Sequence, residues 1–463
     1  MTRTSEDCAF LEDIVDSDRV SFEETYLDHH DRDASPHPPS RPDAVVWPTS
    51  SEEIAEILSA ANERDIPVTP WCGGSGLEGN AIPVEGGIVC NTYNMANITV
   101  VPEDLQATVG AGVVYNDLNE HLERWGLQFP PGISSGDVAT IGGMIATNAS
   151  GFNSVRYGET RDNVRRLEVV LPDGRIVECG RNVMKTSSGY SLKDLIIGSE
   201  GTLGVVTEAT LSLTGLPEHQ RSAIVTFPTP DDASKAVAEI IQYGLNPGAL
   251  EFLDSFSVEV LNSYNNDVAF EEGPTLIIEL HANNTGIDED VEFAQSICME
   301  NNALNWRDPG DFSFDEVWEA RRDVYPAIRA YKDGLKPVLV GDVVVPISKY
   351  PRIIERIKAL SDEIGLMCPC VGHAGDGNIH YNPLVDRNDS EMVSRAEQLN
   401  ARIIEATLDL GGTITGEHGI GLGKRQYMEP EHGVGLDIME ELKATLDPNG
   451  IMNPGKIFPA NRG

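Results

Sequence analysis

The chain has 463 residues, which is long enough for two domains with buried hydrophobic cores. Its 74 acidic and 34 basic residues give a formal net charge of −40, which argues against binding to nucleic acid or to an anionic membrane surface. The acidic residues are spread along the chain, and salt screens the repulsion between them. We therefore expect a halophilic source, with an acidic mesophilic enzyme as the alternative.

The seven cysteines are an odd number at scattered positions, and no two have the C-x-x-C spacing. Neither a disulfide framework nor a built-in iron–sulfur cluster is expected. The chain has no apolar run of about 18 residues, which a membrane-spanning helix requires. Its N-terminal residues also lack the charged and apolar segments of a secretory signal. These features predict a cytoplasmic protein.

Strand and helix signals alternate in the first half. A short strand is predicted over residues 44–47, and a helix follows because Ile54, Ile57, Leu58 and Ala61 recur at helical spacing. A strand over 66–71 runs into a glycine-rich turn, and another helix is expected over 114–127. Residues 165–180 have the two strands and the Asp-Gly turn of a hairpin. A further strand ends before residue 217.

From about residue 218 the pattern changes to longer strands that alternate with helices. Strands are predicted near residues 221–227, 250–254 and 275–282, and an amphipathic helix follows each of them. This succession indicates an α+β domain in which helices cover a sheet.

The turn after the second predicted strand contains Gly74, Gly76 and Gly79, the spacing of a dinucleotide-binding fingerprint. A Rossmann fold would need a helix directly after these glycines, but Pro83 and two more glycines follow. The turn could still surround a phosphate with backbone N–H groups. A purely structural turn is the alternative.

A second block, residues 129–164, has small side chains at nearly every position from Thr140 to Gly151. Small residues let a chain pass close to a flat, bulky ligand, whereas in an ordinary core they would leave voids. A dinucleotide-like cofactor fits this pattern, and a tightly packed loop is the alternative.

Two histidines, His373 and His380, flank an Asp-Gly-Asn turn, and Glu417 and His418 lie further along the chain. Two imidazoles and a carboxylate form a donor set that suits Zn²⁺, Mn²⁺ or Fe²⁺. The spacing alone favours an ordinary hairpin with hydrogen-bonded histidines. A neutral imidazole such as that of His418 can accept a proton near neutral pH.

Six segments resemble, in order, those of FAD-linked oxidoreductases of the vanillyl-alcohol-oxidase type, whose FAD domain is called PCMH-type. The last three are similar to the branch that holds D-lactate dehydrogenase, the glycolate oxidase flavin subunit and D-2-hydroxyglutarate dehydrogenase. The segments are PWCGGSGLEG (70–79), residues 137–164, GYSLKDLIIGSEGTLGVVTEATL (189–211), GHAGDGNIH (372–380), GGTITGEHGIG (411–421) and DPNGIMNPGK (447–456).

The resemblance implies an α+β fold with a two-subdomain FAD-binding domain and a central cap domain, an antiparallel sheet covered by helices. The FAD domain would comprise residues 1–217 and the C-terminal segment 425–463, and the cap domain residues 218–424. FAD would be bound without a covalent link, since the glycine loop has no histidine. The residues implied to contact FAD are Cys72, Gly73, Gly74, Ser75, Gly76, Leu77, Pro131, Gly132, Ile141, Gly142, Gly143, Thr147, Asn148, Gly151, Glu200, Gly201, Val205, Val206 and Asn453.

The same resemblance implies a divalent metal on His373, His380 and Glu417, with zinc first and manganese or iron as alternatives. His418 would be the catalytic base, and Arg321 would bind the substrate carboxylate. Tyr325 and Asn382 would complete the substrate site.

Relatives that oxidise 2-hydroxyglutarate carry a lysine where this chain has Val340, and an apolar residue there leaves a second carboxylate without a partner. D-lactate is therefore the favoured substrate. Lys336 could instead pair with the second carboxylate, so a dicarboxylate substrate stays an alternative. A glycolate oxidase flavin subunit and a zinc hydrolase are further alternatives for the function. A separate electron acceptor is expected: a quinone, an iron–sulfur protein or another carrier. A homodimer and peripheral association with a membrane also stay open.

Overall fold

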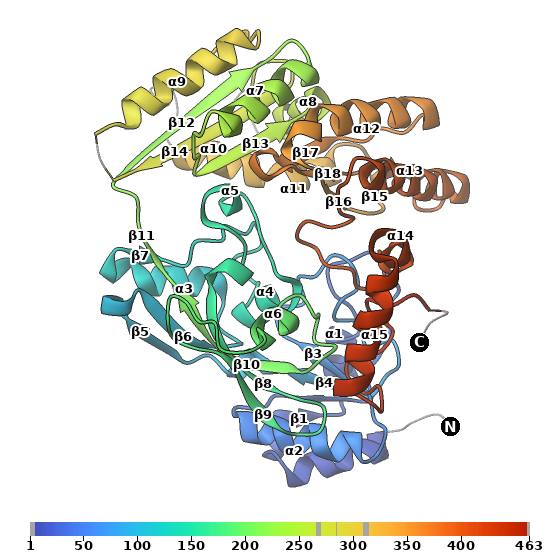
Figure 1. Cartoon of the computed structure of the whole chain (residues 1–463). Coiled ribbons are helices and arrows are strands. Elements are labelled where there is room, and N and C mark those ends of the chain that lie inside the picture. Colours follow the sequence, from blue (N-terminus) through green and yellow to red (C-terminus); the bar gives the residue numbers. More distant parts are fainter. Residues whose placement is uncertain (1–4, 265–269, 284, 309–313, 461–463) are drawn as a thin grey trace. The chain divides into compact units, whose positions relative to one another are not determined.

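A computed structural model describes residues 5–264, 270–283, 285–308 and 314–460 of the chain. The chain forms two compact units, each visible in Figure 1. We call residues 1–150, 158–216 and 417–463 the outer unit, and residues 151–157 and 217–416 the central unit. The sequence placed boundaries after residues 217 and 424. The units change over after residues 216 and 416, and the short segment 151–157 goes with the central unit.

The outer unit contains a mixed sheet in the order β1-β2-β4-β3, in which β2, β4 and β3 are parallel and β1 is antiparallel. Helix α2 buries its predicted apolar stripe in the core beside this sheet. Its cap is Ser50, whose hydroxyl accepts from the Glu53 N–H. These elements are β1 (Val20–Ser21), α1 (Glu24–His29), β2 (Ala44–Val46), α2 (Ser51–Asn62), β3 (Val68–Trp71) and β4 (Ile88–Asn91).

A second sheet of the outer unit is antiparallel, in the order β5-β6-β10-β8-β9. The predicted hairpin at 165–180 is confirmed as β8 and β9. The elements are β5 (Ile98–Val101), β6 (Gln106–Gly110), α3 (Tyr115–Leu122), β7 (Leu127–Gln128), α4 (Ile141–Thr147), β8 (Val164–Val170), β9 (Ile176–Gly180), α6 (Leu192–Ile196), β10 (Val205–Ser212), β11 (Thr214–Gly215), α14 (Met428–His432) and α15 (Val434–Leu446).

The central unit is built on six antiparallel strands in the order β12-β14-β13-β17-β18-β16, which confirms the expected antiparallel sheet. Its elements are α5 (Ser154–Tyr157), β12 (His219–Thr226), α7 (Pro230–Gln242), β13 (Ala249–Leu253), α8 (Ser255–Tyr264), β14 (Thr275–Ala282), α9 (Ile287–Glu300), α10 (Phe314–Arg322), α11 (Val324–Ala330), β15 (Lys336–Pro337), β16 (Gly341–Val344), α12 (Tyr350–Ile364), β17 (Cys370–His373), β18 (Asn378–Tyr381), β19 (Leu384–Val385) and α13 (Ser390–Asp409).

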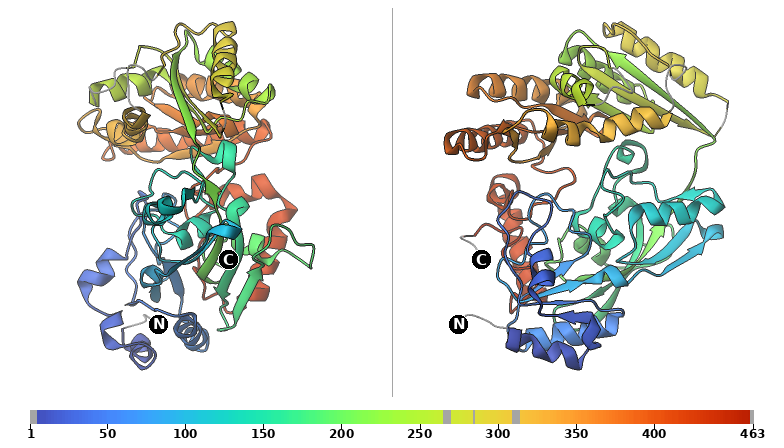
Figure 2. Two further views of the ribbon diagram at one scale, coloured as in Figure 1. Left: turned by 90° about the vertical axis from the view of Figure 1, so that its left-hand side faces the viewer. Right: turned by 180° about the vertical axis from the view of Figure 1, so that it is seen from behind.

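Helices cover both faces of the central sheet (Figure 2). Helices α8, α10 and α11 pack on one face, where Ala249, Leu253 and Val371 join their buried side chains. On the other face, Phe252 meets Tyr350 of α12, which packs against α7 and α13. Alternate residues of a strand point to opposite faces, so Glu251 belongs with Ala249 and Leu253.

The register of the central sheet places four ionisable residues on one face. Glu251 of β13 is opposite His373 of β17, and Asp342 of β16 is opposite His380 of β18. His380 is also opposite Val371, two residues before His373 on β17. The two histidines and the two carboxylates therefore share the face that α8, α10 and α11 cover.

Candidate functional site

The segment GHAGDGNIH forms a tight hairpin. Strand β17 ends at His373, a single turn carries the chain over Gly377, and β18 brings back His380. Gly377 has a φ of +85°, in the left-handed region that glycine adopts without strain. The two imidazole centroids are 5.4 Å apart with their planes at 86°, and both side chains are buried. The hairpin favoured by spacing alone is present, and it also brings the two histidines together.

Glu417 directly follows Gly416, the last residue of the central unit. One ligand atom each from His373, His380 and Glu417 lies within 4.8 Å of the other two. Two imidazole nitrogens and a carboxylate oxygen at this spacing are a donor set for a divalent transition metal. The residues present therefore fit the metal that the sequence suggested.

The imidazole of His373 contacts a buried carboxylate, Glu251, that was not predicted from the sequence. Its Nδ1 atom is 2.7 Å from Oε1 of Glu251, which is fully buried. The other oxygen, Oε2, accepts from Nε of Arg321 at 2.8 Å and lies 2.7 Å from its Nη2. Burial acts to raise the pKa of Glu251, but His373 and Arg321 hold it below its ordinary value. An acidic residue inside the apolar strand ALEFL was the available signal.

A second missed carboxylate, Asp342, lies beside His380. Its Oδ1 atom is 4.0 Å from Nδ1 of His380 and accepts from the Asn378 amide at 2.6 Å. Its Oδ2 atom accepts from the hydroxyl of Thr415 at 2.8 Å and from the N–H of Gly416 at 2.9 Å. Asp342 thus joins the histidine hairpin to the segment that leads into Glu417.

The expected substrate residues lie on three elements of the central unit. Arg321 ends α10 with its side chain largely buried, and Tyr325 is on α11 and partly exposed. Asn382 follows β18 and is buried. Among the described residues, its Oδ1 atom has no hydrogen-bond partner. A buried acceptor without a partner costs free energy unless a ligand or water donates to it. Its position directly after the hairpin of His373 and His380 would suit a contact with substrate.

Two side chains bear on substrate size. Val340, the apolar residue expected to leave a second carboxylate without a partner, is half-buried directly before β16. The ammonium group of Lys336 donates to the carbonyl of Arg329 at 2.5 Å. Lys336 is therefore engaged with the backbone.

His418 follows Glu417, and its Nε2 atom is 3.8 Å from Oε1 of that residue. Its side chain is largely buried, and its backbone carbonyl accepts from the Asn80 amide at 3.4 Å. An imidazole is a group that can act as a general base near neutral pH.

The glycine loop after β3 runs from Cys72 to Asn80 without a helix, which confirms that the Rossmann interpretation fails. A Cβ on Gly73 would come within 2.1 Å of the Val138 carbonyl oxygen, so only glycine fits there. The Cys72 thiol lies 3.1 Å from the hydroxyl of Thr92 and faces protein. The thiol is therefore engaged with protein, whereas the backbone N–H groups of the loop could contact a phosphate.

The small-residue block contains an unexpected short helix, α4, capped by Thr140. Ile141, Met144 and Ile145 face the core, and Gly142 lies against Ala111. Asn148 ends the helix at a φ of 53°. The remaining expected FAD residues of this block are half-buried or buried: Pro131, Gly132, Gly143, Thr147 and, in the segment of the central unit, Gly151.

Glu200, expected to contact FAD, has its carboxylate occupied by protein. The carboxylate accepts from the Asn80 amide at 2.7 Å and from the N–H groups of Ile420 and Gly421 at 2.6 and 2.9 Å. The Asn453 amide donates to the carbonyls of Asn80 and Glu200. These bonds fix the segment just after His418.

The other expected FAD residues near Glu200 are packed against protein. Gly201 packs on Pro70, Val205 is buried and Val206 is half-buried. Lys456, which the sequence analysis missed, donates to the carbonyl of Ile82 and the side chain of Asn453, and burial lowers its pKa to about 8.

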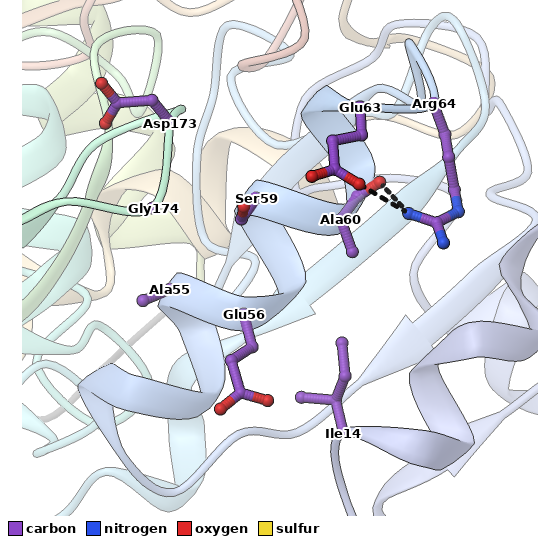
Figure 3. A pocket seen from close by; sticks show the side chains of 9 residues that line it. All are labelled: Ile14, Ala55, Glu56, Ser59, Ala60, Glu63, Arg64, Asp173 and Gly174. Carbon is purple, nitrogen blue, oxygen red and sulfur yellow. Dashed lines mark hydrogen bonds and ion pairs between the residues drawn. The ribbon is translucent and has the colours of Figure 1, made fainter.

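A surface hollow of about 480 Å³ lies elsewhere on the outer unit (Figure 3). Helix α2 forms one wall, and the turn at Asp173 and Gly174 and the side chain of Ile14 complete it. None of the candidate residues above lines it. Among the described residues, no helix is long and apolar enough to cross a lipid bilayer.

The chain is similar to known proteins over nearly its whole length. Residues 42–180 match the family described as FAD binding domain, and residues 216–457 match FAD linked oxidases, C-terminal domain. A probable mitochondrial D-lactate dehydrogenase of Danio rerio is 38% identical, over 98% of this chain and 94% of the relative. A glycolate oxidase subunit of Bacillus subtilis is 37% identical, over 92% and 91%.

Solved structures show the same fold. 4-Ethylphenol oxidase from Gulosibacter chungangensis matches with a TM-score of 0.81 at 18% identity, over 99% of this chain and 98% of that one. p-Cresol methylhydroxylase matches with a TM-score of 0.80 at 16% identity, over 98% and 97%. The chain therefore belongs to the FAD-linked oxidases, flavoenzymes with a PCMH-type FAD-binding fold.

Proposed function

We propose that this flavoenzyme oxidises a D-2-hydroxy acid, D-lactate before others, to the 2-oxo acid with the help of a divalent metal. The observation that carries the proposal is the donor set of His373, His380 and Glu417 within 4.8 Å, with His418 adjacent. The Danio rerio relative, named as a D-lactate dehydrogenase, supports the choice of acid.

The chemistry divides between bound groups and side chains. When bound, the metal lowers the pKa of the substrate hydroxyl, and FAD supplies the hydride acceptor. His418 takes the hydroxyl proton on its imidazole. His373, His380 and Glu417 hold the metal, for which zinc is the first choice and manganese or iron the alternatives.

Arg321 binds the substrate carboxylate in this proposal. A guanidinium has five N–H donors, and the atoms Nε and Nη2 already engage Glu251. The remaining donors are those available to substrate. Tyr325 closes the site, and Asn382 contributes its unpartnered Oδ1 atom.

The FAD contacts proposed from the sequence are all retained. Residues 72–77 would surround the pyrophosphate. The residues that would line the cofactor are Pro131, Gly132, Ile141, Gly142, Gly143, Thr147, Asn148 and Gly151. Glu200, Gly201, Val205 and Val206 would approach its adenine side, and Asn453 would approach its ring. The structure supports a backbone role for the glycine loop, since the Cys72 thiol faces protein. Binding is non-covalent.

Two alternatives remain within the family. The flavin subunit of a glycolate oxidase is favoured by the Bacillus subtilis relative. A D-2-hydroxyglutarate dehydrogenase is disfavoured because Val340 is apolar and Lys336 is bonded to a backbone carbonyl. A zinc hydrolase is wrong, because the chain belongs to a flavin-dependent family.

An anaerobic substrate panel tests the proposal. The FAD-loaded protein in high salt is mixed with D-lactate, L-lactate, glycolate or D-2-hydroxyglutarate, and flavin absorbance is followed. We expect D-lactate to bleach the flavin fastest and L-lactate to leave it oxidised. Faster reduction of the flavin by glycolate than by D-lactate would favour the glycolate oxidase flavin subunit. No reduction by any of the four acids would overturn the proposal.

We still expect a halophilic source, a cytoplasmic location and a separate electron acceptor. A homodimer and peripheral association with a membrane stay open.

A further inference from the structure

We propose that Glu251 and Asp342 are positioning residues of the metal site, each set by sheet register directly opposite one of the two histidines. The inference rests on the proposed function, because it assumes that His373, His380 and Glu417 hold a metal. All the contacts that carry it lie within the central unit.

Glu251 fixes the tautomer of His373. An ionised carboxylate only accepts hydrogen bonds, so the 2.7 Å contact between Oε1 and Nδ1 places a proton on Nδ1. The lone pair of the ring is then on Nε2, which could serve as the metal ligand. A carboxylate behind a ligating imidazole orients the ring and strengthens it as a donor.

Arg321 makes this arrangement possible in a fully buried place. An uncompensated buried carboxylate is costly, and Arg321 supplies the opposite charge on Oε2. The charge of Arg321 thus offsets that of the buried carboxylate through Oε2, the oxygen that does not face His373. In Glu251, Oε1 therefore accepts from His373, and Oε2 pairs with Arg321.

Asp342 acts mainly on the third ligand. Its Oδ1 atom is 4.0 Å from Nδ1 of His380, which is longer than a hydrogen bond. Its Oδ2 atom accepts from Thr415 and from the N–H of Gly416, the residue before Glu417. The carboxylate therefore ties the backbone next to Glu417 to the strand that faces His380.

The test compares Glu251→Gln and Asp342→Asn with a matched control, Glu279→Gln. Glu279 is a buried glutamate of the same sheet, on β14, and it pairs with His281 outside the metal group. Each FAD-loaded variant is titrated with Zn²⁺ against a chromophoric chelator, and the visible spectrum of the Co²⁺ form is recorded. Glu251→Asp is included because it keeps the charge beside Arg321 while it shortens the reach to His373.

We expect Glu251→Gln, Glu251→Asp and Asp342→Asn to weaken Zn²⁺ binding by about 10- to 100-fold and to change the Co²⁺ spectrum. Glu279→Gln should bind Zn²⁺ with the affinity of the wild type and show the same Co²⁺ spectrum. Unchanged affinity and spectrum in the Glu251 and Asp342 variants would overturn the inference and leave the metal site standing. No binding by the wild type would overturn the proposed metal site and the inference with it.

Discussion

Arg321 holds one oxygen of Glu251 with two nitrogen atoms, Nε at 2.8 Å and Nη2 at 2.7 Å. The other oxygen of the same carboxylate is left for His373. The arginine that the sequence assigned to the substrate is thus also the counter-ion of a buried acid. Its replacement should therefore affect folding as well as substrate binding.

Replacing Arg321 by methionine should lower the free energy of unfolding by about 3–5 kcal/mol, because a buried carboxylate loses its counter-charge. Denaturant unfolding in high salt measures the change. The double variant Arg321→Met/Glu251→Gln, which removes both charges, should regain part of the loss. A single variant within about 1 kcal/mol of the wild type would show that Glu251 does not depend on this arginine.

The imidazole of His418 is proposed to take the hydroxyl proton. His418→Gln should therefore slow flavin reduction by D-lactate by about 10²- to 10⁴-fold in stopped-flow measurements. FAD content and metal content should stay at wild-type values. His432→Gln, in α14 of the same unit, is the control and should reduce at the wild-type rate. If flavin reduction in His418→Gln kept the wild-type rate, another group would have to be the base.

Specificity against dicarboxylates is attributed to Val340. Val340→Lys supplies a cation for a second carboxylate and should raise kcat/KM for D-2-hydroxyglutarate relative to D-lactate by at least about tenfold. Val340→Met, a change of size without charge, is the matched control. An equal shift in both variants would mean that shape, rather than charge, sets the preference.

Lys456 should make stability depend on alkaline pH. Burial lowers its pKa from 10.5 to about 8, so between these values the unfolded chain binds the proton and the folded chain does not. Unfolding free energy should then rise with pH across this window by up to about 3 kcal/mol more in the wild type than in Lys456→Met. Parallel pH profiles of the two proteins, measured by denaturant unfolding, would contradict the lowered pKa.

Local signals accounted for much of the fold. The stripe from Ile54 to Ala61 predicted α2, and the Asp-Gly turn predicted the β8–β9 hairpin, because each depends on residues close in sequence. Helix α4 was missed. Its two glycines are poor helix formers, and the packing of Ile141, Met144 and Ile145 outweighs them.

In the candidate site, too, the features that depend on nearby residues could be predicted, and those that depend on distant strands could not. The histidine hairpin could be found because His373 and His380 are seven residues apart around a turn. Glu251 stands out as an acid in an apolar strand, but its partner could not be predicted. Its contact with His373, 122 residues away, depends on the register of distant strands, as does the pairing of Asp342 with His380. Likewise, the sequence could not show that protein groups occupy the carboxylate of Glu200.

The most direct test of the account is flavin reduction after metal removal. The protein is treated with a chelator, its FAD content is verified, and D-lactate is added anaerobically before and after Zn²⁺ or Mn²⁺ is returned. We predict that the metal-depleted flavoenzyme stays oxidised and that one equivalent of metal restores bleaching. Full-rate reduction without metal would contradict the role proposed for His373, His380 and Glu417.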